Sequence, residues 1–598
     1  MTQLQENKSS IELPGQWVMV AEAAEIFAAG RKTIHAGGQV IALFVFDGQI
    51  YAVDNRCPHM GFPLDKGSVR EGILTCHWHH ARFDLSSGGT FDLWADDVRN
   101  FPVKIENGQV WLDLTPPGEA QTRKLKRLND GLERNIRLVV AKATLALVGD
   151  SQDSALDPFH TGLRFAANNR RDGWSTGATI LTAMMNLLPH LDSEDKPRAM
   201  YVGLNAVARD CDGQPVRYAV APLPNPEADL AHLKSWFRQF IEVRDTEGAE
   251  RCIVTAVQAG YSDRQIADMF FAAATDHRYI DTGHPLDFTN KAFEALDWAG
   301  WQPELVAPVL ASLVPVYTGA ERMEESNSWR NPIDLVELLE KTFEGLAAAQ
   351  TEGAGKNWQW SLEDGLVNIL LGDEPHFSLA TLVNALRQGA TPEQLAGVVA
   401  YTAARRVAHF GITNEYGDWN TVHHTFTYAN AVHQGMRRAP SLELLRGVLD
   451  GAMSIYRDRF LNTPPTRLPL PKTEEIASAN PDKLLEDLLL MLNQQQPVNE
   501  AANLVAVYLA TGGDSTKLRA TLGKALLRED AGFHPLQSLE ACFRQYDLLK
   551  QNPATELAAN HVLIAAVRYL AAHCPTARSA NQTYQIALRL TRGEKVFE

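Results

Sequence analysis

Two different hydrophobic patterns divide the chain near residue 120. Before that point, short apolar runs rich in β-branched and aromatic residues alternate with turn residues. Residues 40–53 contain two such runs around an Asp-Gly pair, and residues 103–114 repeat the arrangement around an Asn-Gly pair. Both patterns predict β-hairpins with tight turns. We therefore predict a small all-β domain over residues 12–116.

After a linker predicted at residues 117–124, which paired prolines introduce, the pattern changes to the 3.6-residue period of α-helices. Residues 334–349 illustrate this period. Ser262 and Thr391 each stand before a helical stretch and have a glutamine three residues later, which is typical of a helix N-terminus. We therefore predict a large all-α domain over residues 125–598.

Three stretches of the helical region resemble one another. Each has a glycine just before one predicted helix and a histidine at the predicted start of the next, namely His284, His424 and His534. Six residues past these histidines lie Asn290, Asn430 and Glu540, and nine residues past them lie Phe293, His433 and Phe543. The histidines are too far apart for a short solenoid repeat. We predict three diverged copies of a duplicated helical module, at residues 228–320, 362–460 and 498–590.

Composition and charge narrow the range of functions. The 598 residues correspond to about three to five domains, or to two unequal ones. The net charge of −16 disfavours nucleic acid and anionic membranes as partners. Uninterrupted apolar runs fall far short of the roughly 18–20 residues of a membrane span, and the first residues lack a secretory signal. Six scattered cysteines do not form a disulfide framework, so we expect a reducing, cytoplasmic compartment.

Cysteine and histidine occur in two paired clips within the predicted β domain. Cys57 and His59 form the first clip, and Cys76 and His79 form the second. Two thiolates and two neutral imidazoles are the ligands of an asymmetric 2Fe–2S cluster, in which the imidazoles raise the reduction potential. The alternative is a structural zinc site with two cysteines and two histidines. Zinc clips usually pair like with like at gaps of two to four residues, so this spacing favours the cluster.

These clips resemble those of the Rieske family, over about a sixth of the chain. The Met-Gly-Phe-Pro stretch after the first clip and the Ala-Arg-Phe-Asp stretch after the second are similar to the family pattern. The resemblance implies that Cys57 and Cys76 are thiolate ligands and that His59 and His79 are imidazole ligands. It also implies iron–sulfur electron transfer and an electron-donating reductase or ferredoxin as partner.

Two positions depart from the family pattern. The family usually has proline where His77 stands and glycine where His80 stands, and we expect the bulky residue at position 80 to reshape the second loop. Respiratory-chain members also carry a loop disulfide, but Phe62 and Trp78 occupy those positions here. The resemblance is therefore to the ferredoxin and oxygenase type, whose potentials lie toward the lower end of roughly −150 to +300 mV.

The helical region does not match the usual partner of an oxygenase Rieske domain. Those oxygenases hold a mononuclear iron with two histidines and one carboxylate, in a segment with four residues between the histidines. No two of the 18 histidines here have that separation. The Glu-x-x-His repeats of di-iron bundles are missing as well. The sequence therefore does not predict a standard Rieske oxygenase.

The histidines of the helical region are the remaining candidates for chemistry. If the modules pack around one axis, we expect His284, His424 and His534 to converge as bases or metal ligands of a second metal or cofactor. The alternative is that each histidine only caps its helix. His423, His424 and His433 form the group that we favour first, because three imidazoles within eleven residues are difficult to explain by packing.

A second, shorter resemblance concerns the segments around His284 and His424. They are similar to histidine-rich helical repeats of questin oxidase-like proteins, which oxidise aromatic polyketide ketones. This resemblance implies an aromatic substrate class.

The leading hypothesis is a Rieske-type oxidoreductase. An external donor reduces the N-terminal cluster, which passes electrons to a substrate or second cofactor in the helical domain, and the expected reaction is oxygenation of an aromatic or apolar small molecule. Fusion of a carrier to another domain implies an intramolecular acceptor, because it raises the effective donor concentration. The alternative is a non-catalytic electron-transfer or redox-sensing protein with a helical interaction scaffold. Histidines that lie far apart, each capping its own helix, would favour the alternative.

Overall fold

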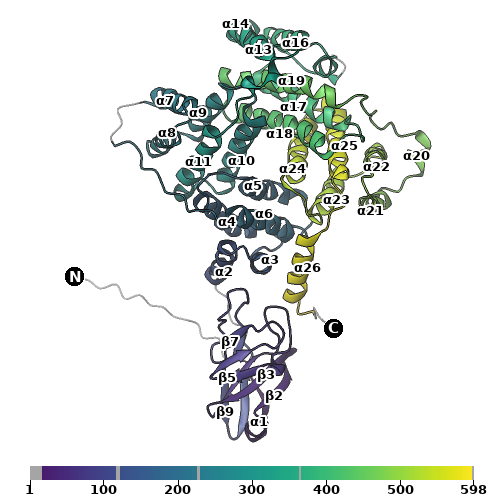
Figure 1. Cartoon of the computed structure of the whole chain (residues 1–598). Coiled ribbons are helices and arrows are strands. Elements are labelled where there is room, and N and C mark those ends of the chain that lie inside the picture. The colour runs from purple at the N-terminus through teal and green to yellow at the C-terminus, as the bar shows by residue number, and fades with distance from the viewer. Residues whose placement is uncertain (1–15, 116–120, 225–228, 363–364, 595–598) are drawn as a thin grey trace. The chain divides into compact units, whose positions relative to one another are not determined.

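The computed structural model describes residues 16–115, 121–224, 229–362 and 365–594, and it divides into two units (Figure 1). Among the described residues, the first unit holds residues 16–130, 136–146 and 584–594. The second unit holds residues 131–135 and 147–583. The first unit thus combines the β domain with helical segments that follow it and with the last described residues.

Antiparallel strands build the β domain in three small sheets, with the orders β1-β10-β9, β2-β3-β4-β8 and β5-β6-β7. A short helix, α1 (Ala23–Ala29), follows the first strand. The strands are β1 (Trp17–Glu22), β2 (Arg31–Ala36), β3 (Gln39–Phe46), β4 (Gln49–Asp54), β5 (Ser68–Arg70), β6 (Ile73–Thr75), β7 (Arg82–Asp84), β8 (Asn100–Phe101), β9 (Val103–Glu106) and β10 (Gln109–Asp113).

The two predicted hairpins are confirmed. Asp47 and Gly48 join β3 to β4 with φ values of 47° and 71°, and Asn107 and Gly108 join β9 to β10 with φ values of 53° and 78°. Positive φ at both central residues matches the twist of the flanking strands, and aspartate, asparagine and glycine tolerate it best. Local turn chemistry therefore explains these pairings.

The β domain has two hydrophobic cores. One lies among β1–β4, β9 and β10 and contains Ile41, Leu43 and Leu112. The other surrounds the two predicted cluster clips and contains Leu64, Leu74, Phe83, Leu85 and Val98, together with both clip cysteines. The second core therefore provides an apolar base for the clips.

Three helical segments belong to the same unit as the β domain. They are most of α2 (Gln121–Glu133), most of α3 (Arg137–Leu147) and the end of α26 (Ser579–Thr591). Arg56, which precedes the first clip, donates from Nη2 to the carbonyl of Leu590 at 3.2 Å. Of the predicted linker, residues 117–120 lie outside the described residues, and the remainder begins α2. Residues 12–15 of the predicted domain also lie outside them.

The second unit is helical, and no strand occurs in the described part of residues 121–594. Its first helices are α4 (Leu156–Asn168), α5 (Thr176–Leu187), α6 (Lys196–Cys211), α7 (Leu230–Glu242), α8 (Thr246–Gln258), α9 (Asp263–Thr275), α10 (His284–Trp298), α11 (Pro303–Thr318), α12 (Asn327–Arg330), α13 (Leu335–Glu344), α14 (Leu346–Gly353) and α15 (Leu366–Leu370). The others are α16 (Pro375–Arg387), α17 (Pro392–Ala408), α18 (Tyr416–Arg438), α19 (Leu442–Asp458), α20 (Thr473–Ser478), α21 (Pro481–Met491), α22 (Val498–Ala510), α23 (Ser515–Leu527), α24 (Phe533–Lys550) and α25 (Glu556–Ala572).

A four-helix order recurs in the stretches that the sequence relates to one another. It comprises α8–α11, α16–α19 and α22–α25, and a predicted histidine lies on the third helix each time. Capping boxes at Ser262 and Thr391 begin α9 and α17, as predicted. The helix predicted at residues 334–349 is instead two helices, α13 and α14, joined at Gly345. The exact module boundaries stay a prediction.

One predicted helix start is wrong. His424 does not begin a helix but lies more than two turns inside α18, which starts at Tyr416. Glu415 caps α18 through a reciprocal pair with Asp418, a less usual version of the capping box. His284 is the first residue of α10 and His534 the second residue of α24. The third helix of the middle group thus has an N-terminal extension that the other two lack.

Among the described residues, Pro303–Glu325 is long and apolar enough to cross a membrane by length and composition alone, with a mean hydropathy of 1.2 over 18 residues. A search for uninterrupted apolar runs does not detect this stretch, because Pro308, Ser312 and Pro315 interrupt it. Of that window, 56% is buried, and α11 packs against α4, α8 and α10. This is the behaviour of a core helix.

Candidate metal centres

Two loops of the β domain carry the predicted cluster ligands. The amide of Cys57 donates to the carbonyl of Phe62 at 2.8 Å, and the amide of Cys76 donates to the carbonyl of Ala81 at 2.8 Å. Each bond ties a cysteine to the residue five positions later. Both loops therefore have a fixed base at the cysteine and a turn that presents the histidine.

The cysteine ligands and the histidine ligands differ in their burial. The side chains of Cys57 and Cys76 belong to the second core, and these residues are 2% and 1% exposed. His59 is half-buried and His79 is exposed, and their ring centroids lie 4.8 Å apart with an interplanar angle of 84°. The thiols are thus sealed from water, whereas the imidazoles lie toward the surface.

The protonation states suit a cluster. A side-chain hydrogen bond between the cysteines raises the pKa of Cys57, and the same bond lowers the pKa of Cys76 to about 6. Burial, assisted by the positive charges of His79 and Lys142, lowers the pKa of His59 to about 4. A thiolate therefore forms readily next to a neutral imidazole. This donor set fits one iron held by Cys57 and Cys76 and a second iron held by His59 and His79.

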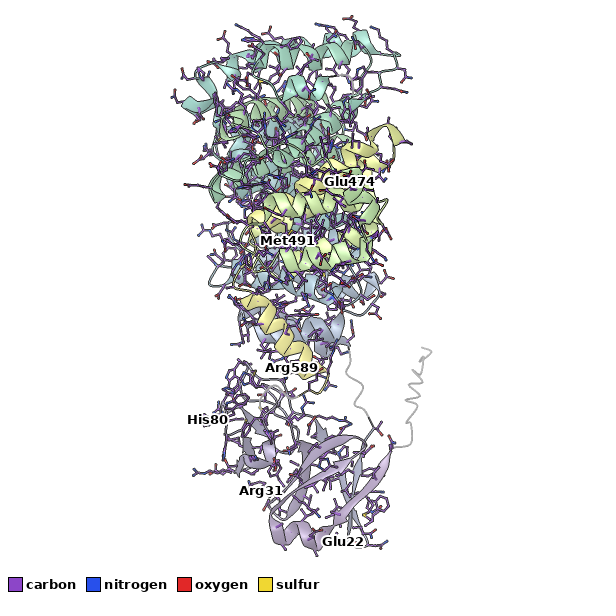
Figure 2. All side chains as sticks on the ribbon, turned by 90° about the vertical axis from the view of Figure 1, so that its right-hand side faces the viewer. Glu22, Arg31, His80, Glu474, Met491 and Arg589 are labelled. Carbon is purple, nitrogen blue, oxygen red and sulfur yellow. The ribbon has the colours of Figure 1, made fainter. Side chains whose placement is uncertain are left out.

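The second loop keeps its closing hydrogen bond despite the residue at position 80. His80 adopts a left-handed backbone conformation with a φ of 62°, and its side chain is exposed at the surface of the domain (Figure 2). This conformation explains why glycine is usual here, since a side chain costs roughly 1–2 kcal/mol in it. His77, by contrast, lies within hydrogen-bond distance of the Ser68 hydroxyl, at 3.1 Å.

An aromatic ring lies against each of the two ligand histidines. The ring of Trp94 lies edge-on to His59 at 4.7 Å, and the ring of Trp78 lies 4.4 Å from His79. Trp94 comes from a third loop, which Ala95 and Val98 anchor in the second core. The sequence gives no signal for the contact between Trp94 and His59, because the loop of Trp94 is distant from both clips along the chain.

Comparison with known proteins agrees with this geometry. The family model of the Rieske [2Fe-2S] domain matches residues 16–102. The ferredoxin component of the naphthalene 1,2-dioxygenase/salicylate 5-hydroxylase systems of a Ralstonia species is 31% identical over 99 residues, which cover 16% of this chain and 95% of the ferredoxin. The chain belongs to the Rieske [2Fe–2S] family. Its Rieske domain binds a 2Fe–2S cluster, so the zinc alternative is discarded.

Other relatives are matched over a smaller share of their length. The 4beta-methylsterol monooxygenase of Methylococcus capsulatus is 34% identical over 108 residues, which cover 16% of this chain and 29% of the relative. Human Apoptosis-inducing factor 3 is 26% identical over 195 residues, which cover 32% of this chain and 28% of the relative. The chain thus spans less than a third of either protein. The likeness supports Rieske redox function for the N-terminal domain.

In the helical unit, the histidines at the three recurring positions come together. One ring nitrogen from each of His284, His424 and His534 lies within 4.8 Å of the other two, and the Nε2 atoms of His424 and His534 are 2.8 Å apart. Their helices meet because α18 packs against both α10 and α24. We call these residues the three-histidine cluster. Its convergence was expected from the sequence, and its catalytic role stays a prediction.

The three-histidine cluster has the geometry to bind a transition-metal ion. Metal–nitrogen bonds of about 2.1 Å place ligand nitrogens about 3.0–3.4 Å apart, so only a small movement of the rings is required. Burial lowers the pKa of His424 to about 3 and that of His534 to about 4. Burial also lowers the pKa of His284. The three rings are therefore neutral and able to coordinate at neutral pH.

A strained segment precedes His284. Tyr279, Asp281 and Thr282 have φ values of 44°, 42° and 52°, and Gly283 follows with a φ of 95°. Each non-glycine residue in this region costs on the order of 1–3 kcal/mol. A Cβ atom at Gly283 would lie 2.8 Å from the Cβ atom of Tyr428. The surrounding structure thus maintains an unfavourable backbone at the point where it positions His284.

The capping alternative for these histidines is wrong. The N-caps of α10 and α24 are Gly283 and Gly532, and neither helix has a side-chain cap hydrogen bond. His424 lies in the interior of α18. Capping therefore does not account for the recurring histidines.

The structure does not bring His433 to His423 and His424. His433 follows His424 by nine residues, or about 13 Å of helix, and its Nδ1 lies 3.1 Å from Gln545 Oε1 in the core. His423 is fully buried, and its ring lies 5.3 Å from His534 and 5.0 Å from Tyr569. His424 alone joins the three-histidine cluster.

A buried carboxyl group lies about one helical turn after His284 on α10, and no sequence pattern indicated it. Asp287, on α10, accepts a hydrogen bond from Gln537, three residues past His534 on α24. Burial raises the pKa of Asp287 to about 7. This group can hold or release a proton near neutral pH, close to the histidines along the same helices.

Replacing one thiolate ligand is expected to remove the 2Fe–2S cluster. In the full chain, Cys57→Ser removes one of the two thiolate ligands of one iron, so visible colour, iron and labile sulfide should all be lost. Cys252→Ser provides a matched control, since Cys252 is also 2% exposed but lies on α8. Retention of iron and sulfide by Cys57→Ser would show that the ligand assignment is wrong.

Relieving the backbone conformation at position 80 is expected to stabilise the loaded Rieske domain. His80→Gly should stabilise the domain by about 1 kcal/mol and raise the temperature of half-loss of cluster absorbance at a fixed heating rate. His77→Gly is the control because His77 is absent from the residues with positive φ. It should lower that temperature, since the chain gains backbone freedom when unfolded. Equal shifts in both variants would contradict the explanation.

Proposed function

We propose that this protein is a Rieske oxidoreductase in which the three-histidine cluster binds a transition-metal ion that accepts electrons from the 2Fe–2S cluster. The observation that carries the proposal is the convergence of three neutral imidazoles from three different helices. Cys57, Cys76, His59 and His79 would hold the cluster, which supplies one-electron transfer when bound. His284, His424 and His534 would hold the second metal.

Fusion of the two sites in one chain supports an intramolecular acceptor. A tethered donor reaches its acceptor at a high effective concentration, whereas a separate ferredoxin must diffuse to it. The relatives include ferredoxin components of oxygenase systems, which supports electron-transfer partners for the Rieske domain. We expect a separate reductase or ferredoxin to supply electrons to the exposed side of the cluster, where His79 lies.

The surroundings of the three-histidine cluster support an apolar, aromatic substrate. The rings of Phe288 and Phe533 lie 5.4 Å and 5.9 Å from that of His284. A relative's name connects it with naphthalene dioxygenation, and the short likeness to questin oxidase-like proteins points to the same substrate class, although that likeness stays a prediction. We propose oxygenation by dioxygen, with the Rieske cluster as the source of electrons and Asp287 as a group able to hold a proton nearby.

The competing proposal is a redox-sensing protein whose helical unit only binds partners. It requires one 2Fe–2S cluster and no second metal. The convergent histidines and the strained backbone before His284 favour the oxidoreductase, because strain of this kind accumulates at functional sites.

Metal analysis of the purified full chain tests the proposal. The wild type should contain the two irons of the 2Fe–2S cluster and a further transition-metal ion. His284→Ala, His424→Ala and His534→Ala should each weaken binding of that further ion by at least about 10–100-fold and leave labile sulfide unchanged. His433→Gln, on the same helix as His424, should retain it. The proposal fails if the wild type holds only the cluster iron, or if the further ion survives in all three alanine variants.

A further inference from the structure

The helices that follow the Rieske domain contribute side chains to the loops that carry its cluster. The family match ends at residue 102, whereas α2 and α3 begin at Gln121 and Arg137. Both helices nevertheless belong to the same unit as the β domain for most of their length. Their side chains can therefore act on the cluster.

Two cations from these helices meet at one aspartate. Arg127 of α2 donates from Nε to Asp96 Oδ1 at 2.6 Å, and Lys142 of α3 forms an ion pair with Asp96 Oδ2. Arg127 also donates to the backbone carbonyls of Leu93 and Ala95, at 3.2 Å and 2.6 Å. These contacts hold the third loop on both sides of Trp94, whose ring lies against the ligand His59.

Lys142 also reaches the first ligand loop. Its ammonium donates to the carbonyl of Pro58 at 2.6 Å, and Pro58 stands between the ligands Cys57 and His59. The Lys142 side chain is 18% exposed. A mostly buried cation is thus bonded to the residue that separates two cluster ligands in the sequence.

Lys142 places a positive charge at the ligand loop. Asp96 shares its single negative charge between Lys142 and Arg127, and Arg127 also interacts with Asp97 and Asp130, whereas Lys142 contacts the carbonyl of Pro58 in the ligand loop. Reduction adds one electron to the cluster. A nearby positive charge stabilises the more negative, reduced state, and screening by water and salt is weak for a buried group.

We propose that Lys142, held by Asp96, is a positioning residue that raises the reduction potential of the 2Fe–2S cluster. The lysine lies outside the domain that the family shares, so the helical region adjusts the potential of its own electron carrier. The inference depends on the bound cluster, which the family assignment establishes, and not on the second metal. It therefore stands whether or not the three-histidine cluster binds an ion.

Redox titration of the full chain tests this inference, with the midpoint potential of the cluster followed by visible absorbance at pH 7. Lys142→Met keeps the length of the side chain and removes its charge, so the midpoint should shift to a lower value. Lys142→Arg keeps the charge and should restore most of the wild-type midpoint. Asp96→Asn removes the negative charge, and the midpoint should rise.

The control is Lys124→Met. Lys124 lies on α2 and donates to the carbonyl of Ala146 at 3.1 Å, away from the ligand loops. Its loss tests whether any disturbance of the two helices alters the cluster, and the midpoint should stay at the wild-type value. Iron and labile sulfide are measured in every variant, so that potentials are compared at equal loading.

A purely structural role for Lys142 predicts a different pattern. Loosening the loops by Lys142→Met or by Asp96→Asn would then shift the midpoint in the same direction, and Lys142→Arg would not restore it. That pattern, or an unchanged midpoint in fully loaded Lys142→Met, overturns the proposal. If Lys142→Met does not load the cluster, Asp96→Asn decides: a raised midpoint supports the charge effect, and an unchanged or lowered midpoint overturns it.

Discussion

Two thiols and two imidazoles have to meet at one point while the thiols stay out of water, and the Rieske domain depends on this constraint. Each ligand loop satisfies it with one backbone hydrogen bond, from a cysteine amide to the carbonyl five residues later. The bond fixes the base of the loop, and the second core, with Leu64, Leu74 and Phe83, covers that base. Because each histidine follows its cysteine by only two or three residues, it reaches the turn of the loop. Loop length thus explains why the cysteines are buried while the histidines lie closer to the surface.

The helical unit brings three imidazoles together by a different route. No two of His284, His424 and His534 are close in sequence, so their approach depends on the packing of α18 against α10 and α24. The position of His284 also depends on the preceding residues, which have a left-handed backbone conformation. Tyr279 is held there by packing, with its ring 5.0 Å from that of Tyr428 and 5.8 Å from that of Trp329. The burial of these large rings offsets the backbone strain, which would otherwise be relieved by a local rearrangement.

The features that the sequence predicted are local ones. Asp-Gly and Asn-Gly turns, the capping boxes at Ser262 and Thr391, and the spacing of the cluster clips all act within a few residues, and the structure has each of them. The convergence of the three histidines was predictable only because the modules repeat. The start of α18 was misplaced because its cap uses Glu415 and Asp418 and not the more usual serine or threonine. The contacts of Trp94 and Lys142 join residues 35 and 84 positions apart, from Trp94 to His59 and from Lys142 to Pro58, so no short motif could indicate them.

Judged by its side-chain contacts, the Rieske unit extends further along the chain than the sequence pattern indicates. By sequence pattern the β domain stops near residue 116, yet Arg127 and Lys142 bind the loops that surround its cluster. Removing α2 and α3 would leave Asp96 as an unpaired negative charge next to the ligands and would free the carbonyls of Leu93 and Ala95. The positive charge of Lys142 at the first ligand loop would then be lost, and Trp94 would lose the support of its loop. The functional electron carrier therefore includes these helices, and the boundary that matters for its redox chemistry lies after α3.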